Sequence, residues 1–434
     1  MSAFAFRPTT RTGFMLAPAY PNHWESSRLR FVCEFNPSKR QIADLDPSIP
    51  VSFIPMEKVS EDGVMKLDDE RPIEAVSNGF TFFADGDVVV AKITPCFENG
   101  KGAECKGLIN GFGFGTTEFH VLRSKHLDSR YLFYITASEP FRTIGATEMS
   151  GAAGQKRVPE SFLQNLIVPL PPLPTQRRIA AYLDCKTRQI DLLVAEKETL
   201  LGLLEEKRAS LISHAVTRGL HPKAKLKPSG IPWLGDVPVH WELKPFRHVV
   251  SIASGQVDPR ADEFKQAILI APNHIESGTG RLVGRETAID QGAISGKYLV
   301  RQGEVIYSKI RPELRKACIA PEDCLCSADM YPMRTGGELL PEFLLYFLLG
   351  EAFSRLVVLE SMRVAMPKVN REMLAPCAIP VPPLAEQTEI TRVLRNTLSA
   401  IDSATQEIQT SITLLREKRS SLISAAVTGE MAVP

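Results

Sequence analysis

The stretch PPLPTQ at Pro171–Gln176 occurs a second time, as PPLAEQ at Pro382–Gln387. Each copy leads into a long run, and the two runs superpose without a gap at a constant offset of 211 positions, the difference between Pro171 and Pro382. Near the ends of the runs, EKRASLI at Glu206–Ile212 falls on EKRSSLI at Glu417–Ile423. An internal repeat determines the architecture of a chain and is considered before other patterns. The chain is therefore predicted to be a duplication.

Apolar residues recur at seven-residue intervals in both runs, which extend to Val216 and Val427. This a/d spacing over four to five heptads is typical of a coiled-coil seam, and the prolines suit the first turn of a helix. About 40 residues at 1.5 Å each give a rod of roughly 60 Å. The main column comprises Leu183, Ile190, Leu204, Leu211, Leu394, Ile401, Ile408, Leu415 and Leu422. A second column in the first run comprises Ile179, Leu193 and Leu200.

An amphipathic helix of this length requires a partner surface, and the other copy is the obvious candidate. We therefore expect the two helices to pair antiparallel. The alternative is two separate helices, each packed on its own domain. Lys197 stands in the main column of the first run and argues against a completely dry interface there.

A second set of matches organises the rest of the chain. PNHWE at Pro21–Glu25 recurs as PVHWE at Pro238–Glu242, now at an offset of 217. The change from 217 to 211 means that the first globular segment is six residues longer, somewhere between Pro95 and Pro169. The predicted boundaries are an N-terminal extension at 1–19, a globular domain at 20–170, a long helix at 171–218, a linker at 219–232, a second globular domain at 233–381 and a second long helix at 382–430.

Within the globular segments, short apolar runs follow turn signals. Val88–Ile93 and Val305–Ile310 are predicted to be strands that leave tight turns. The apolar spacing becomes helical at Leu127–Ser138 and Pro341–Leu349. The predicted class is α+β: two mixed α/β globular domains joined by two long helices that form an antiparallel coiled coil, with an internal pseudo-twofold repeat.

The composition is that of an ordinary globular chain, with 434 residues, 44% hydrophobic residues and a mean hydropathy of −0.06. No apolar run approaches the 18 residues of a membrane span, and the first residues lack a signal-peptide pattern, so a cytoplasmic location is expected. Eight scattered cysteines without a CxxC pair predict free thiols and no metal site. A formal net charge of +1 argues against a polycation but is compatible with local basic surfaces.

No common catalytic motif is found in the sequence. A P-loop needs Gly-Lys followed by Ser or Thr, but Gly102 follows the first Gly-Lys and Tyr298 the second. GFGFG at Gly111–Gly115 is not followed by a helical pattern and predicts a turn or strand edge. The patterns Gly-x-Ser-x-Gly and His-Glu-x-x-His, and the Asn-Pro-Pro-Tyr element of amino-methyltransferases, are absent. We predict no catalytic residue and no metal ligand in this chain.

Each globular segment ends in a loop with small and basic residues, at 150–159 and 363–371. Small residues allow close backbone approach, Lys and Arg suit phosphates, and Gln, Asn and Arg can contact base edges. The alternative is ordinary solvated surface, and the matched places in two diverged domains favour DNA contact. The candidate DNA-binding residues are Lys92, Gln155, Lys156, Arg157, Lys309, Arg311, Arg315, Lys368, Asn370 and Arg371.

Lys92 and Lys309 stand at the same place in the two repeats. A residue shared by both halves is predicted to hold a phosphate, since the halves should read different bases. The alternative is a structural lysine whose aliphatic stem covers apolar surface. Arg157 and Arg371 lie in loops that differ between the halves and are predicted to read bases.

The repeated helix starts, the two Glu-Lys-Arg-x-Ser-Leu-Ile segments, and GIPWLG at Gly230–Gly235 leading to His240 and Trp241 together resemble the specificity subunits of type I restriction–modification systems. The motifs span nearly the whole chain, and their combination is much more specific than any one of them. The first copy departs from the family pattern, because Thr175 precedes Gln176 where an acidic residue is usual.

The resemblance implies a non-catalytic subunit of a host-defence complex, with two target-recognition domains that each read one half of a bipartite double-stranded DNA site. The paired helices would act as a spacer and dock two modification (methyltransferase) subunits, and restriction (helicase–nuclease) subunits would join the assembly. S-adenosylmethionine, ATP and magnesium are then expected on the partner subunits and no cofactor on this chain.

Two readings from other classes compete with this one. The first is a coiled-coil scaffold whose globular domains bind proteins and not DNA, against which the matched basic loops argue weakly. The second is an enzyme with an unrecognised site, which the absence of paired catalytic motifs disfavours. A gel-shift assay of the chain with its methyltransferase partner would distinguish both of these readings from sequence-specific DNA binding. The bases of the target do not follow from the sequence.

Overall fold

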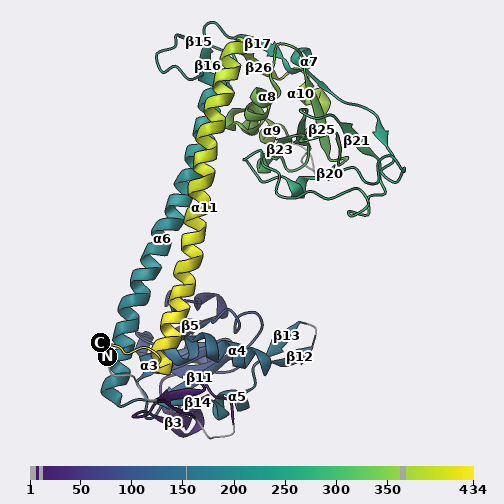
Figure 1. The fold of residues 1–434 in the computed structure, drawn as a ribbon. Helices are drawn as coiled ribbons and strands as arrows, with labels where there is room; N and C mark the ends of the chain where they lie inside the picture. The colour runs from purple at the N-terminus through teal and green to yellow at the C-terminus, as the bar shows by residue number, and fades with distance from the viewer. Residues whose placement is uncertain (1–5, 9–12, 153, 362–367) are drawn as a thin grey trace. The chain divides into compact units, whose positions relative to one another are not determined.

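The computed structural model describes residues 6–8, 13–152, 154–361 and 368–434, without side chains for 6–8. The chain divides into two compact units. Unit 1 comprises residues 1–196 and 410–434, and unit 2 comprises residues 197–409. The long helices α6 (Leu173–Arg218) and α11 (Leu384–Thr428) each contribute one part to each unit (Figure 1).

The globular part of unit 1 contains two four-stranded sheets, with strand orders β6-β5-β10-β7 and β4-β11-β8-β9. The pairing of β5 with β10 is parallel, and the other pairings are antiparallel. Every residue of β8, which contains three consecutive valines, is buried, as expected for a central strand covered on both faces. The strands are β4 (Cys33–Phe35), β5 (Pro50–Ile54), β6 (Glu70–Pro72), β7 (Thr81–Ala84), β8 (Asp87–Ala91), β9 (Gly102–Glu104), β10 (Phe112–Gly115) and β11 (Phe119–Ser124).

Unit 2 repeats this organisation, with sheets ordered β18-β25-β22-β23 and β19-β21-β24-β20. Strand β22 is fully buried and occupies the position of β8. A two-stranded pairing closes each globular part, β14 (Ile167–Leu170) with β3 (Glu25–Arg28) and β26 (Ala378–Val381) with β17 (Glu242–Pro245). The remaining strands of the two sheets are β18 (Val250–Ile252), β19 (Gln256–Val257), β20 (Leu269–Ile270), β21 (Lys297–Val300), β22 (Val305–Ser308), β23 (Ala317–Ile319), β24 (Cys324–Cys326) and β25 (Met330–Thr335).

In each unit a pair of consecutive helices packs between the sheets and the long helices. These are α3 (Ser129–Ala137) and α4 (Glu139–Thr147) in unit 1, and α8 (Pro341–Leu349) and α9 (Glu351–Ser361) in unit 2. The shorter helices are α1 (Leu29–Val32), α2 (Ile73–Val76), α5 (Glu160–Asn165), α7 (Phe246–Val249) and α10 (Arg371–Leu374), with 3₁₀ turns η1 (Lys39–Ile42), η2 (Met56–Lys58), η3 (Ile109–Gly111), η4 (Pro272–His274) and η5 (Pro312–Leu314).

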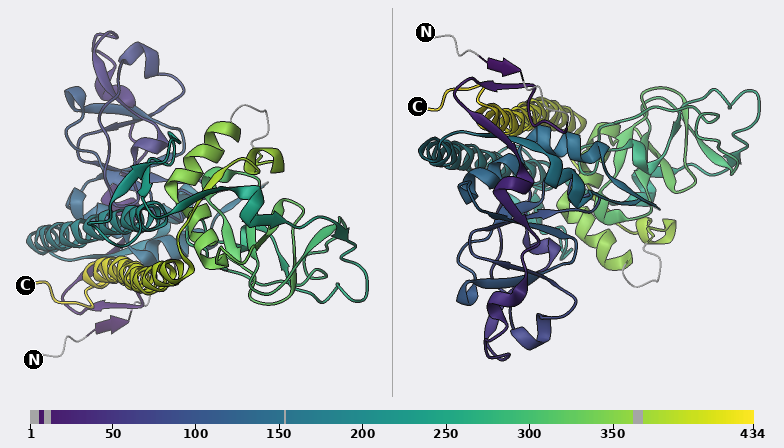
Figure 2. Two further views of the ribbon diagram at one scale, coloured as in Figure 1. Left: turned by 90° about the horizontal axis from the view of Figure 1, so that it is seen from above. Right: turned by 90° about the horizontal axis from the view of Figure 1, so that it is seen from below.

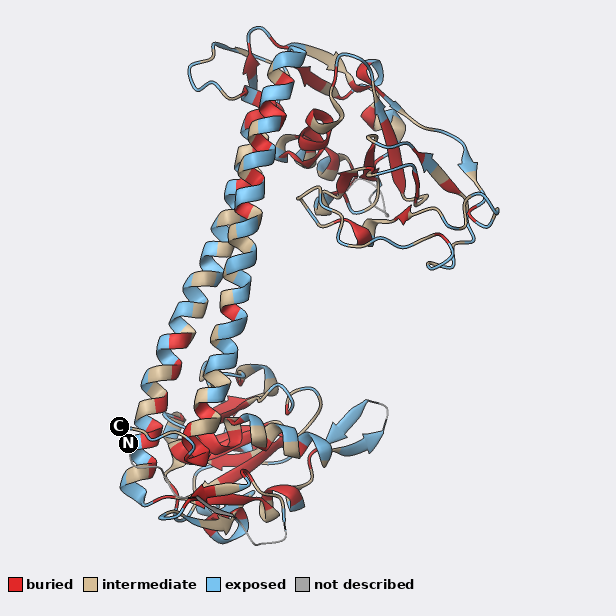
Figure 3. Cartoon of the chain, in the orientation of Figure 1, coloured by how far each residue is buried: buried red, intermediate tan, exposed pale blue. Residues whose placement is uncertain are grey.

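The ends of the long helices belong to the core of each unit. In unit 1, Leu183 of α6 and Val427 of α11 share one buried cluster with Tyr131 of α3. In unit 2, Val216 and Leu394 share a cluster with Phe343 of α8. The buried residues coloured red in Figure 3 therefore continue from the sheets onto the helices in each unit. Burial of these apolar faces accounts for helices that propensity alone would not hold in place.

Within each unit, the parts of α6 and α11 lie side by side (Figures 1 and 2). They run in opposite directions, since Arg208 of α6 pairs with Asp402 of α11 in unit 2 and Asp191 of α6 pairs with Arg419 of α11 in unit 1. All nine residues of the predicted main column are shielded. Four are buried (Leu183, Ile190, Leu394 and Ile401), and five are half-buried (Leu204, Leu211, Ile408, Leu415 and Leu422). The predicted antiparallel helix pairing is therefore confirmed.

The predicted second column was wrong at two of its three positions, because Leu193 and Leu200 are 46% and 44% exposed, whereas Ile179 is buried as predicted. The residues that complete the seam of α6 lie one position further along the chain, at Thr187, Val194, Leu201 and Arg208. Neighbouring apolar residues, Leu193 beside Val194 and Leu200 beside Leu201, leave the choice between adjacent positions open to a sequence pattern. The buried or half-buried positions then alternate by three and four residues, as a heptad seam requires.

Two segments outside the main sheets also form strands. β1 (Phe6–Pro8) pairs with β2 (Ala19–Pro21), while residues 1–5 and 9–12 of the predicted N-terminal extension fall outside the described residues. β15 (Leu226–Pro228), inside the expected linker, pairs with β16 (Asp236–Pro238). None of the helices in the described ranges combines the length and the apolar content needed to cross a bilayer.

Candidate nucleic-acid interface

The unit 1 candidates Gln155, Lys156 and Arg157 form strand β13 of a hairpin with β12 (Ser150–Ala152), in which all six strand residues are exposed. The hairpin is held at its base. The Thr94 N–H and hydroxyl both donate to the carbonyl oxygen of Lys156, at 3.0 and 3.2 Å. Lys92 lies beside this base, since its carbonyl accepts from the N–H of Val158 at 2.8 Å. All four unit 1 candidates are thus brought together at the hairpin.

Arg157 is already paired in the free protein. Its guanidinium donates two hydrogen bonds to the carboxylate of Glu118, at 2.9 and 2.8 Å, and these bonds lower the pKa of Glu118. The fork uses two of the five N–H groups of the guanidinium and fixes the orientation of its plane. The contact fixes the base of the hairpin.

Unit 2 carries the same backbone arrangement. The Lys309 carbonyl accepts from the N–H of Val369 at 2.8 Å, and Ile310 bridges to Lys368 as Ile93 bridges to Arg157. Lys309 and Lys368 are therefore the counterparts of Lys92 and Arg157. The rest of the predicted second loop, Arg363 to Pro367, lies outside the described residues.

Three unit 2 candidates, Lys309, Asn370 and Arg371, make contacts within the folded chain. Arg371 donates to the carbonyls of Ala253 and Ile252 at 2.7 and 3.3 Å, and its guanidinium lies 5.5 Å from the ring centroid of Tyr331. The Lys309 ammonium lies 5.3 Å from the same ring. Asn370 is the N-cap of α10, where its side-chain oxygen accepts from the N–H of Met373 at 2.7 Å. Base reading by Asn370 and Arg371 stays a prediction.

Arg311 and Arg315 flank the turn η5, and both have left-handed backbone conformations. Arg311 is exposed. Arg315 is half-buried and faces a cavity of about 510 Å³ within unit 2, lined also by Glu276, Arg208 and Asp402. Arg315 thus has other side-chain neighbours than Lys309, whose ammonium lies over the ring of Tyr331. The mixed charges of this cavity do not define a phosphate site.

One residue in each unit that supports the candidate interface was not predicted from the sequence. His120 is buried, and its Nε2–H donates to the carbonyl of Val158 at 2.9 Å. Tyr331, its counterpart in unit 2, donates its hydroxyl to the carbonyl of Val369 at 3.1 Å. Burial lowers the pKa of His120. His120 and Tyr331 stand 211 positions apart, as the repeat requires. Because one is a histidine and the other a tyrosine, the sequence alone does not reveal that both donate to the same main-chain carbonyl position.

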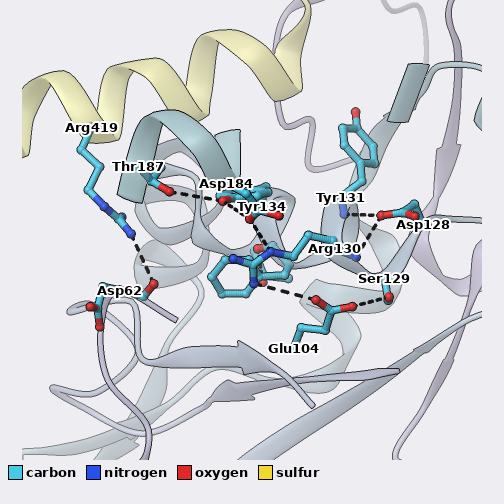
Figure 4. Close-up of polar contacts among 12 residues, drawn as sticks. Asp62, Glu104, Asp128, Ser129, Arg130, Tyr131, Tyr134, Asp184, Thr187 and Arg419 are labelled. Carbon is cyan, nitrogen blue, oxygen red and sulfur yellow. Dashed lines mark hydrogen bonds and ion pairs between the residues drawn. The ribbon is translucent and has the colours of Figure 1, made fainter. Parts of the chain in front are cut away.

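A polar network attaches the globular part of unit 1 to its long helix (Figure 4). Arg130 of α3 donates to Asp184 of α6 at 2.7 Å, and Tyr134 donates to the same carboxylate at 2.7 Å. The Arg130 guanidinium also lies over the rings of Phe133 and Tyr134. These contacts orient the domain that carries the hairpin.

One glutamine in each helix start completes the attachment. The buried Gln176 accepts from the N–H of Asp128 and donates to the carbonyl of Pro171, both at 2.8 Å. The buried Gln387 accepts from the N–H of Leu340 and donates to the carbonyls of Glu338 and Pro382, all at 2.8 Å. The repeated Pro-Pro-Leu-x-x-Gln motif thus satisfies backbone groups at the join between each globular part and its helix.

Comparison with known proteins agrees with this duplicated organisation. The model of the type I restriction modification DNA specificity domain matches residues 21–201 and 238–414. The EcoDI specificity subunit of Escherichia coli is 30% identical over 284 residues, which cover 62% of this chain and 63% of that subunit. The EcoAI specificity subunit of the same species is 44% identical over 166 residues, which cover 37% of this chain and 27% of the relative. The matched segments therefore span less than two thirds of these relatives.

Two solved structures have the same fold. One chain, from a study of complex assembly and conformational transition of the type I R-M system, matches with a TM-score of 0.75 and 18% identity, covering 95% of this chain and 99% of that one. The HsdS subunit from Thermoanaerobacter tengcongensis matches with a TM-score of 0.54 and 20% identity over 95% of this chain and 98% of its own.

The repeated α+β units with shared long helices define the class, a duplicated protein built on two helix-linked domains. The chain belongs to the family of type I restriction modification DNA specificity domain proteins.

Proposed function

We propose that this chain is the DNA-specificity subunit of a type I restriction–modification complex, in which each globular part reads one half of a bipartite target. One observation carries the proposal. Lys92 in unit 1 and Lys309 in unit 2 each stand at the end of a strand. In both units the main-chain carbonyl of this lysine accepts a hydrogen bond from a second basic segment, which contains Arg157 in unit 1 and Lys368 in unit 2. Duplicated basic sites on diverged domains suit two different half-sites on one duplex.

The proposed partners are two modification subunits and the restriction subunits, which would carry S-adenosylmethionine, ATP and magnesium. Support for docking on the helices comes from Leu203 and Leu414, which occupy equivalent positions and are 56% and 58% exposed. An exposed leucine at the same position of each helix suits two copies of one partner. The membership of the chain in the specificity family supports the same assembly.

The test is selection of random duplexes with the chain assembled with its cognate modification subunit, followed by methylation profiling. The expected result is two specified half-sites separated by an unspecified spacer. Salt-dependent binding without any base preference would contradict the proposal. Absence of DNA binding would favour the scaffold alternative.

A further inference from the structure

The β12–β13 hairpin is the one element of unit 1, among the described residues, whose strands are exposed along their whole length and contain no apolar side chain larger than alanine. A hairpin that buries no apolar surface contributes little to the core. Its six strand residues are Ser, Gly and Ala on β12 and Gln, Lys and Arg on β13. β12 therefore carries only small side chains, and β13 carries three long side chains that can donate hydrogen bonds.

The structure also holds this hairpin in one orientation. Residues 93–94 pair with β13 on the side opposite to β12, so β13 is the central strand of three at the base. The Glu118–Arg157 pair clamps the inner end of β13. Gly151 has a φ of 148°, and a Cβ there would collide with the carbonyl oxygen of Gln155. Glycine therefore permits the close approach of the two strands.

These features lead to the inference, which rests on the proposed function. We propose that the β12–β13 hairpin enters the major groove of the unit 1 half-site as a two-stranded ribbon, with Gln155 reading a base edge and Lys156 contacting a phosphate. The major groove, about 12 Å wide, admits a two-stranded ribbon. Gln155 stands nearest the tip, and Lys156 points to the opposite face because side chains alternate along a strand. Arg157 is then a positioning residue and not a reader.

The test compares Gln155→Ala and Lys156→Ala in the full chain assembled with its modification subunit. Binding is measured to the selected duplex and to every single-base-pair variant of it, over a range of salt concentrations. Gln155→Ala should lower discrimination at one base pair by about 5- to 150-fold and leave the other half-site unchanged. Lys156→Ala should weaken binding to all duplexes by a similar factor and lower the salt slope by about one.

The matched control is Lys66→Ala, which removes an exposed lysine from the same unit outside the hairpin and should change neither quantity. Dimethyl sulfate interference reports the groove, since guanine N7 lies in the major groove and adenine N3 in the minor groove. Interference confined to adenine N3 in the unit 1 half-site would contradict the groove assignment. Full discrimination and an unchanged salt slope in both variants, with a specific wild-type complex, would overturn the inference. A wild-type complex without sequence preference would overturn the proposed function instead.

Discussion

Arg130 and Asp184 join α3 to α6 at 2.7 Å, and unit 2 makes the equivalent contact with its charges exchanged: Arg395 of α11 donates to Glu342 of α8 at 2.6 Å. Each globular part is therefore matched electrostatically to its own helix. If the globular part of unit 1 were attached to α11 in place of α6, Arg130 would lie beside Arg395. The repulsion between these two cations would disfavour that attachment. The duplication has thus diverged at the surfaces that attach its two domains.

The first prediction concerns this pair. Arg130→Glu should destabilise unit 1 by about 1–3 kcal/mol, because it places a carboxylate beside Asp184 and Glu104 and removes a cation from the faces of Phe133 and Tyr134. Adding Asp184→Arg should recover part of the loss. The measurement is a double-mutant cycle followed by denaturant unfolding.

The same cycle on Glu342 and Arg395 serves as the comparison. These side chains are 35% and 61% exposed, so their coupling should be under about 1 kcal/mol. Strictly additive effects in the unit 1 cycle would show that the ion pair does not hold α3 on α6.

The second prediction is a pH dependence of unit 1. The pKa of His120 is lowered by burial, so the unfolded chain binds its proton more readily than the folded one. The stability tied to His120 is therefore fully present above pH 6.5 and decreases as the pH falls toward the folded pKa. His120→Tyr introduces the residue found at this place in unit 2, whose hydroxyl bonds the equivalent carbonyl.

Thermal unfolding at several pH values checks this. The difference in stability between His120→Tyr and the wild type should shift in favour of the variant between pH 7.5 and pH 5.5. Parallel pH profiles for the two proteins would mean that His120 does not titrate differently on folding.

The third prediction concerns Gln387. Gln387→Ala removes a fully buried amide and leaves the N–H of Leu340 and the carbonyls of Glu338 and Pro382 without this partner. A loss of about 2–4 kcal/mol in the stability of unit 2 is expected. Gln189→Ala, on the exposed surface of α6, is the matched control and should cost less than about 0.5 kcal/mol. Equal effects of the two substitutions on denaturant unfolding would refute the assigned role.

The fourth prediction separates the two roles proposed for Lys309. If its ammonium holds a phosphate, Lys309→Ala weakens binding to cognate and mismatched duplexes alike and lowers the salt slope by about one. Lys223→Ala, which removes an exposed lysine from the linker, should leave the slope unchanged. An unchanged salt slope in Lys309→Ala would contradict the phosphate role. The lysine would then have a structural role, through its cation–π contact with Tyr331.

The sequence predicted the elements whose burial repeats regularly. α6 and α11 each begin two residues after the predicted start, at Leu173 and Leu384, and α8 has the predicted bounds. A seven-residue apolar period and an ungapped repeat determine such helices strongly. A short apolar column does not decide between adjacent apolar residues, which explains why Leu193 and Leu200 were assigned to the seam in place of Val194 and Leu201.

The candidate interface was harder to predict because its features have no period. The segment 150–159 was predicted to be a loop, but its strands carry no apolar alternation that would reveal the β12–β13 hairpin. The pairing of Arg157 with Glu118 joins residues 39 positions apart and depends on the fold. The exchanged charges of Arg130 and Glu342 hide their equivalence in a comparison of residue types.

The contacts of Gln176 and Gln387 go only to main-chain atoms, and this has a consequence for how the gene can change. A main-chain N–H or carbonyl is present whatever side chain a neighbouring domain carries, so the connector fits any domain that presents the same backbone. Recombination with a junction at the codons of Pro171 or Pro382 would bring in a foreign domain and keep this joint intact. Under the proposed function, a new DNA preference could then arise in a single event, without compensating substitutions in the helices at this joint.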